Sequence, residues 1–148
     1  MLTIVLVDPK IPQNTGNIGR ICAANEVRLH IVGTPAFDMD DKAVKRAGLD
    51  YWQYLNIETF PDIEAYFEQI KDEPKHLLTT KTTNLYTDCS FGPDDYLIYG
   101  SETDGLPPHL RERFADECCT LPMKSPHVRS LNLANSVSIV LYHALYTA

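Results

Sequence analysis

Three short stretches of the chain carry glycines, or clusters of polar or charged side chains, of the kind that is typical of binding or catalytic loops. The first, QNTGNIGR at 13–20, has Gly16 and Gly19 where a helix is expected to open, and it ends on Arg20. Each glycine costs a helix about 1 kcal/mol relative to alanine, which indicates close approach of a ligand or of neighbouring backbone. Tight helix packing is the alternative. Arg20, on the same face as Asn17, could clamp a phosphate with its planar guanidinium or form a simple surface ion pair.

The second stretch, GSETDGLPP at 100–108, carries two carboxylates, Glu102 and Asp104. Paired carboxylates can act as general acid and general base, as they do in glycoside hydrolysis. Two acids in one turn are more often part of a solvated loop. Gly100 and Gly105 bracket the stretch and indicate a tight loop with exposed backbone amides. A binding loop and a hydrolytic pair therefore both remain open.

The third stretch, LPMKSPHVRSLNLANS at 121–136, leads into an apolar helix whose first turn is polar. Helix capping accounts for either Ser130 or Asn132. It does not account for the whole cluster, which also includes Asn135 and Ser136. We expect this loop to bind a ligand.

Several other kinds of site are not indicated. The chain has neither GxGxxG nor GxxxxGK[ST], so dinucleotide and ATP sites are disfavoured. Its five histidines show no HxxH or HExxH pairing, and no metal site is expected. Its four cysteines show no CxxC spacing and are expected to be buried free thiols: Cys22, Cys89, Cys118 and Cys119.

Size and charge favour one acidic globular domain over the whole chain, 1–148, with no appended RNA-binding domain. The chain has 148 residues, is 44% hydrophobic and carries a formal net charge of −7. Any contact with nucleic acid must therefore be local, because the overall field would repel it. The N-terminal apolar run is too short for a signal peptide or a membrane span, which predicts a cytoplasmic protein.

The secondary-structure elements expected around these stretches alternate between strand and helix. Strands are expected at 2–7, 28–32, 76–80, 96–99 and 118–121. Helices are expected at 16–25, from 40 or 41 to 47, at 63–71 after Pro61-Asp62, around 108–114 and at 131–146. This order predicts an α/β fold with a mostly parallel sheet flanked by helices, and ligands would bind at the carboxyl ends of the strands. The closing helix is apolar nearly all round and is expected to face a partner subunit.

Taken in order, NTGNIGR, GSETDGLP and RSLNLANSVSIVLYHAL resemble the three motifs of the SPOUT class of RNA methyltransferases. Within that class the chain is similar to the TrmL subfamily, the tRNA (cytidine/uridine-34) 2′-O-methyltransferases. The similarity runs from Leu2 to about Tyr146 and includes DDKAVKRAGLDY at 40–51. The resemblance implies a C-terminal deep trefoil knot that forms the S-adenosylmethionine site, a homodimer, and an anticodon stem-loop as substrate, with leucine tRNAs expected.

The resemblance also implies residue roles. Arg20 would lie at the reaction centre with Asn14 and Asn17, and the glycines beside it would admit RNA backbone. Tyr142 and Arg129 would lie nearby, from either subunit. Lys124 and His127 are not assigned, because the segment before Ser130 differs among relatives. The cofactor would lie against Leu78, Thr79, Thr80, Gly100, Glu102, Gly105, Leu121, Ser130, Leu131 and Asn132.

The expected mechanism needs no metal. Arg20 stays protonated, so we expect it to orient the ribose hydroxyl and stabilise the alkoxide rather than act as a base. Lys42, Lys45 and Arg46 form one basic helix face, and with Arg129 they would bind RNA, although a solvated helix face is the simpler reading. The alternatives are a different tRNA position or rRNA, a non-catalytic RNA-binding dimer, and a small-molecule hydrolase using Glu102 and Asp104.

Overall fold

A computed structural model describes residues 1–39, 42–47 and 50–147. The helix α2, Lys42–Ala47, agrees with the expected element. Its expected cap at Asp40 or Asp41 and its expected end at Gly48 lie outside the described residues.

Six parallel strands form one sheet in the order β3-β2-β1-β5-β4-β6. In the central register, Thr3 of β1 pairs with Arg28 of β2 and with Tyr96 of β5. The five predicted strands are confirmed, and their bounds differ from the prediction by up to two residues. The sixth, β3, was missed because only its two end residues are partly buried, which leaves no apolar run. The bounds are β1 Thr3–Val7, β2 Arg28–Val32, β3 Ile57–Phe60, β4 Lys75–Leu78, β5 Tyr96–Tyr99 and β6 Cys118–Cys119.

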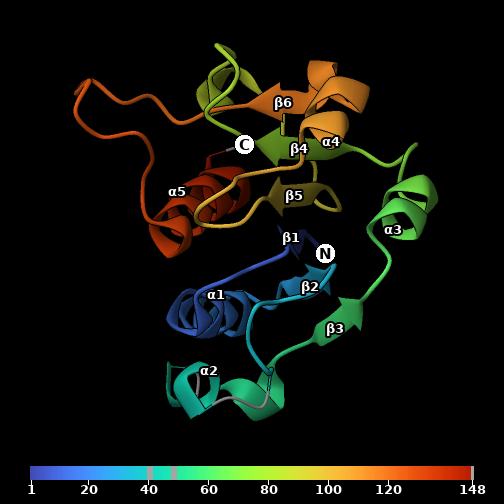
Figure 1. Cartoon of the computed structure of the whole chain (residues 1–148), viewed down its shortest axis with the longest axis vertical. Helices are drawn as coiled ribbons and strands as arrows, with labels where there is room; N and C mark the ends of the chain where they lie inside the picture. Colours follow the sequence, from blue (N-terminus) through green and yellow to red (C-terminus); the bar gives the residue numbers. More distant parts are fainter. Residues whose placement is uncertain (40–41, 48–49, 148) are drawn as a thin grey trace.

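Helices cover both faces of the sheet (Figure 1). One face carries α1, Pro12–Ala24, and α5, Leu133–Tyr146, with α2 packed outside α1. The other face carries α3, Ile63–Gln69, and α4, Pro108–Arg113. Three 3₁₀ turns complete the chain: η1 Trp52–Tyr54, η2 Tyr86–Asp88 and η3 Ala115–Glu117. Because both faces are covered, every residue of β1 is buried.

The helix ends refine the predictions. Helix α1 begins at Pro12, four residues before the predicted start at Gly16, since proline suits the first helical turn. QNTGNIGR therefore lies inside α1 rather than opening it. Asp62 caps α3 as predicted, with its carboxylate accepting from Ala65 N at 3.0 Å. Helix α5 is capped by Asn132, whose side chain accepts from Asn135 N at 3.1 Å.

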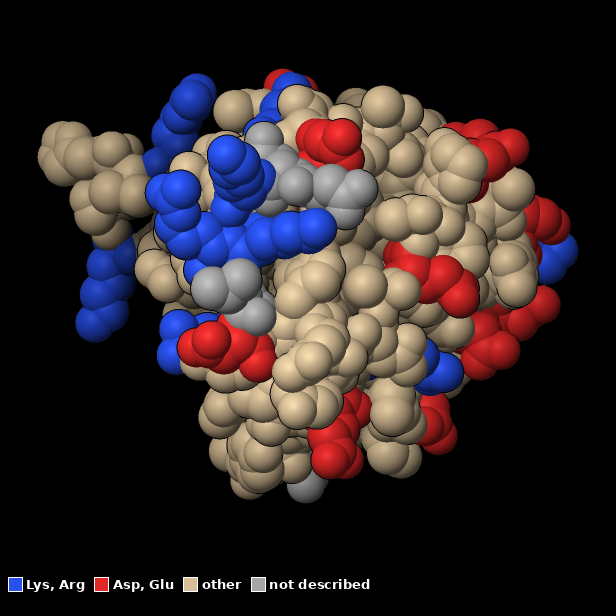
Figure 2. Space-filling model, turned by 90° about the horizontal axis from the view of Figure 1, so that it is seen from below, with Lys and Arg blue, Asp and Glu red and all other residues tan. Residues whose placement is uncertain are grey.

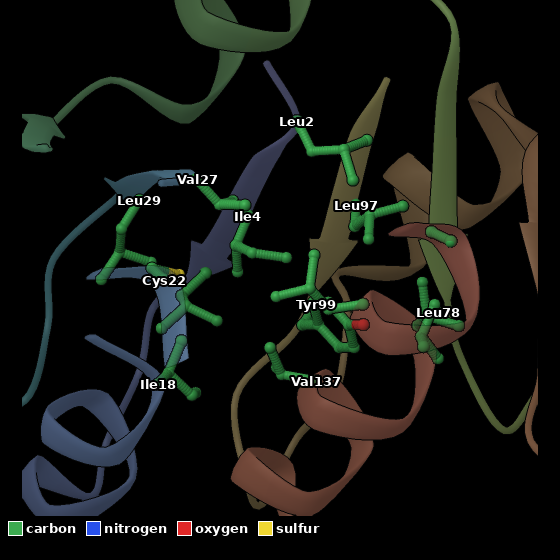
Figure 3. Close-up of a cluster of buried hydrophobic side chains, with 14 of the residues drawn as sticks. Leu2, Ile4, Ile18, Cys22, Val27, Leu29, Leu78, Leu97, Tyr99 and Val137 are labelled. Carbon is green, nitrogen blue, oxygen red and sulfur yellow. The ribbon is translucent and has the colours of Figure 1, made fainter. Parts of the chain in front are cut away.

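A hydrophobic core lies on each side of the sheet. The larger one packs Ile4 and Leu97 of the sheet against Ile18 of α1 and Val137 of α5 (Figure 3). All four cysteines are free, as predicted, although Cys89 is only half-buried. Burial raises the pKa of Cys22 to about 12, so this thiol is unreactive at neutral pH.

Candidate active site

The loops that follow β4, β5 and β6 enclose one pocket of about 750 Å³, which we call the three-loop pocket. Residues 129–131 and the first turns of α5 complete its wall. The pocket lies at the carboxyl ends of the strands, where an open α/β sheet is expected to bind ligands. Its volume lies within the range of about 300–1,000 Å³ that is usual for small-molecule sites.

Nearly all of the predicted cofactor residues line this pocket. Asn132 is the exception: it lies beside the pocket wall as the cap of α5. Residues that sequence reasoning missed also line it, among them Lys81, Arg111 and Met123. Met123 belongs to the stretch 121–136 already singled out, Lys81 directly follows the predicted cofactor residues Thr79 and Thr80, and Arg111 lies on α4, where no motif marks it. The predicted residues that line the pocket are Leu78, Thr79, Thr80, Gly100, Glu102, Gly105, Leu121, Ser130 and Leu131.

The loop after β5 requires both of its glycines. A Cβ on Gly100 would lie 2.0 Å from the carbonyl carbon of Gly105, so the loop can close only over a residue without a side chain. Gly105 has a φ of 69°, which disfavours other residues. Its amide donates to Ser101 O at 3.0 Å, and Asp104 N donates to Ser101 Oγ at 3.0 Å. The sequence therefore folds here into a tight turn whose backbone forms part of the pocket wall.

Glu102 caps the start of α1. One carboxylate oxygen accepts from Lys10 N at 2.9 Å, and the other accepts from Ile11 N at 2.8 Å and from Asn14 Nδ2 at 3.2 Å. Asp104 forms an ion pair with the Lys10 ammonium group. Both carboxylates thus hold the loop after β5 against α1, which disfavours their use as a free acid–base pair.

Asn14 connects the three motifs. It is 6% exposed, donates to Glu102, and accepts at Oδ1 from Asn132 Nδ2 at 3.2 Å. Glu102 comes from the loop after β5 and Asn132 from the start of α5. A chain of hydrogen bonds, Glu102–Asn14–Asn132, therefore joins stretches that are about 90 to 120 residues apart in sequence.

The Tyr99 side chain is a poor candidate for a general base. Tyr99 lines the three-loop pocket but is only 2% exposed, and its hydroxyl has no hydrogen-bond partner among the described residues. Burial raises its pKa well above the ordinary value, so the hydroxyl stays protonated.

Arg20 and Asn17 lie outside the three-loop pocket, on the exposed side of α1. The Arg20 guanidinium carbon lies 4.7 Å from the centre of the Tyr51 ring. A Cβ on Gly19 would lie 3.0 Å from Leu55 Cδ2 and 3.6 Å from Trp52, so Gly19 serves close packing of that segment. The expectation that this glycine admits RNA backbone is wrong, because protein side chains already fill the space.

Tyr142 also lies outside the three-loop pocket. It is 44% exposed on α5, six residues beyond the pocket-lining Ser136, which is about 9 Å along the helix. Its hydroxyl accepts from Asn25 Nδ2 at 3.3 Å. Tyr146 donates to Asn25 Oδ1 at 2.9 Å. A single chain therefore does not bring Arg20, Asn17 and Tyr142 to the pocket.

The positive charges are concentrated in a few places on the surface, as expected for a chain with a net charge of −7. Figure 2 shows most of the Lys and Arg side chains of the face seen from below gathered at the left, with Asp and Glu side chains scattered over the right and lower parts. Lys42, Lys45 and Arg46, which we call the α2 patch, are all exposed. Arg129 is exposed and lines the three-loop pocket.

Over the described residues, no three His, Cys, Asp or Glu side chains are grouped to hold a metal, and no helix could span a membrane.

Known proteins resemble this chain over nearly its full length. The profile of the SpoU rRNA Methylase family matches residues 1–142. The tRNA (cytidine(34)-2′-O)-methyltransferase of Escherichia coli K12 is 43% identical over 145 residues, which are 97% of this chain and 92% of that protein.

Two solved structures extend the likeness to the fold. A structure from work on "2-OH methylation of C/U34 on tRNA" has a TM-score of 0.91 at 35% identity, covering 97% of this chain and 93% of that one. The SpoU methyltransferase AviRb of Streptomyces viridochromogenes, solved with S-adenosylmethionine, has a TM-score of 0.86 at 24% identity. The match covers 99% of this chain and 60% of that one. The second likeness concerns the fold alone.

Proposed function

The chain belongs to the SpoU rRNA methylase family, and from that premise we propose that it methylates the ribose 2′-hydroxyl of nucleotide 34, cytidine or uridine, in tRNA. The observation that carries the proposal is the full-length likeness to an enzyme named for this reaction. Its fold is the SPOUT fold, a parallel α/β sheet with a knotted C-terminal part. The choice of leucine tRNAs, the single-domain organisation and a cytoplasmic location remain predictions.

The three-loop pocket suits S-adenosylmethionine, the family's methyl donor. Leu78, Leu121 and Leu131 give it apolar walls, and Thr79 and Ser130 add hydroxyl groups. A Cβ on Gly105 would meet nothing within 4 Å, so the space beside this residue of the pocket wall is open. When bound, the donor supplies a methyl group on a sulfonium, which needs no metal.

Arg20 is the group that we assign to the RNA side of the reaction. Its guanidinium stays protonated, so it cannot take the proton of the 2′-hydroxyl. It orients that hydroxyl and the adjacent phosphate and stabilises the developing alkoxide. Asn17 lies one turn earlier on the same exposed side of α1 and helps to hold the ribose. The proton passes to phosphate or to water.

A second copy of the chain completes the site. Exposed residues recur at helical spacing on the packed pair α1 and α5, and we call this surface the α1–α5 face. Its apolar members, Ile139, Tyr142 and Tyr146, are 41%, 44% and 67% exposed. Pairing two such faces in a homodimer covers them and carries Arg20, Asn17 and Tyr142 toward the partner's pocket. The face consists of Gln13, Asn17, Arg20, Ala24, Asn135, Ile139, Tyr142 and Tyr146.

The α2 patch and Arg129 bind the anticodon stem-loop. Each cation that neutralises a phosphate releases counterions, which gives affinity without requiring a positive total charge. The dimer presents the patch twice, and Arg129 stands at the pocket itself. RNA is thus held at the site by local charge, while the remainder of the acidic surface repels it.

Transfer of labelled methyl from S-adenosylmethionine to total RNA from cells that lack this protein tests the proposal. We expect label in tRNA, at the ribose of nucleotide 34, and loss of label with Arg20→Ala. Label in rRNA or at another tRNA position would replace the assigned substrate while keeping the chemistry. No label in any RNA, with cofactor still bound, would favour the non-catalytic dimer and overturn the proposal.

A further inference from the structure

An aromatic ring holds the guanidinium of Arg20 from one side. The guanidinium carbon lies 4.7 Å from the centre of the Tyr51 ring, within the range of about 6 Å for a cation–π interaction. Within the described part of the chain, no hydrogen bond or ion pair to Arg20 occurs. None of the five N–H donors of the side chain is therefore taken up by the residues that the structure describes.

Close packing brings the ring to this place. Gly19 precedes Arg20, and its missing side chain leaves room for Leu55 and Trp52 against α1. The turn η1 is closed by Tyr54 N donating to Tyr51 O at 2.9 Å and by Leu55 N donating to Trp52 O at 3.2 Å. Docking of η1 on Gly19 thus sets the position of Tyr51. Gly19 therefore serves the tight packing that the sequence left open as the alternative reading, and this packing also positions Tyr51.

Whether the neighbour of the Arg20 guanidinium is a carboxylate or an aromatic ring matters for the chemistry assigned to Arg20. A carboxylate in place of the ring would neutralise the guanidinium and occupy its donors. A ring restrains the side chain while leaving its charge and its donors available. We propose that Tyr51 is a positioning residue, which holds Arg20 ready for the ribose and phosphate of the RNA. This inference rests on the proposed function.

Three variants separate the ring from other roles of this segment. Tyr51→Leu removes the ring, Tyr51→Phe keeps it, and Tyr54→Leu changes a 74% exposed residue of the same turn as a matched control. With saturating S-adenosylmethionine, we expect Tyr51→Leu to lower kcat about tenfold. Tyr51→Phe and Tyr54→Leu should remain near wild type, and the KM for the methyl donor should not change.

A double-mutant cycle tests whether Tyr51 acts through Arg20. In an Arg20→Ala background, Tyr51→Leu should cause no further loss. An equal loss in both backgrounds would overturn the proposal, as would normal turnover of Tyr51→Leu. A Tyr51→Phe enzyme as slow as Tyr51→Leu would assign the effect to the hydroxyl and also overturn it.

A spectroscopic measurement keeps this test separate from the proposed function. In ¹⁵N NMR spectra of the free protein, the Arg20 Nε–H resonance should show a ring-current shift that Tyr51→Leu removes and Tyr51→Phe retains. An unchanged resonance in Tyr51→Leu would overturn the inference even if tRNA is methylated. Failure of the wild type to methylate tRNA, with this shift present, would instead overturn the proposed function alone.

Discussion

The three-loop pocket and the α1–α5 face are built in different ways. The pocket is made by one chain: its loops follow three neighbouring strands, and the Glu102–Asn14–Asn132 hydrogen bonds close it against α1. The face is open, with Arg20, Asn17 and Tyr142 directed away from the core. The pocket is lined within one chain, whereas in the proposed function the face presents its groups to a second molecule.

In the proposed function, this difference separates binding of the methyl donor from binding of the methyl acceptor. The lining of the three-loop pocket comes from a single chain. The reaction assigned to Arg20 needs RNA and, in the proposed dimer, a second subunit. Substitutions in the α1–α5 face should therefore lower turnover without changing cofactor affinity. Substitutions in the three-loop pocket should lower cofactor affinity.

Arg20→Ala should have the largest effect on turnover. Loss of a group that stabilises developing charge typically lowers kcat by about 10²–10³-fold. Cofactor affinity, measured by calorimetry, should not change, because Arg20 does not line the three-loop pocket. Arg20→Lys, which keeps the charge but loses the planar fork, should also be slow. Near-normal turnover of Arg20→Lys would contradict the assigned role.

Gly100→Ala should have the opposite pattern. Its Cβ would lie 2.0 Å from the backbone of Gly105, which cannot move without opening the loop. We expect a loss of about 1–3 kcal/mol or more in the free energy of unfolding, together with loss of cofactor binding. Denaturant unfolding and calorimetry measure the two effects, with Gly92→Ala in the loop before β5 as a control for stability alone. Retained cofactor affinity would show that this loop does not form the donor site.

Asn14→Ala tests the connection between the two regions. It leaves Glu102 and Asn132 each without one partner inside the protein, at a cost of about 1–3 kcal/mol in stability. Asn14→Asp is the sharper variant, because a second carboxylate next to Glu102 should be more harmful than alanine. Thermal unfolding compares them. If alanine were the more harmful of the two, the hydrogen-bond chain would not be the connection described.

Reversing charge on the α2 patch should have the smallest effect. Lys42→Glu with Arg46→Glu should weaken tRNA binding about tenfold and reduce the salt dependence of binding. Cofactor affinity should stay at the wild-type value, since neither residue lines the three-loop pocket. Affinity and salt dependence equal to wild type would remove this helix from the RNA-binding surface.

The sequence predicts the three-loop pocket better than it predicts the α1–α5 face. Pocket residues follow apolar strands and carry glycines and polar side chains, so their places at one sheet edge follow from alternation of strands and helices. The partners of Glu102 could not be predicted, because Lys10 and Asn14 approach it only after folding. Gly19 was misread for the same reason: the side chain that fills its space, Leu55, lies far along the chain.

Helix faces were predicted only in part. The apolar circumference of α5 indicated a partner, and the exposure of Ile139 and Tyr146 supports that interpretation. The start of α1 was placed too late, because its capping group is Glu102 rather than a residue beside the helix. Strand β3 was missed, since its pairing with β2 rather than its own composition holds it in the sheet.

Subunit complementation measures whether two chains share the proposed reaction site. Arg20→Ala lacks the acceptor-side group, and Leu131→Arg, a half-exposed residue of the pocket wall, blocks the donor site. Each variant alone should be inactive. Statistical exchange of subunits should restore about a quarter of wild-type activity, because half of the dimers then hold one intact composite site. No recovery in a mixture shown to contain heterodimers would place Arg20 and the pocket that it serves in the same chain and contradict the account.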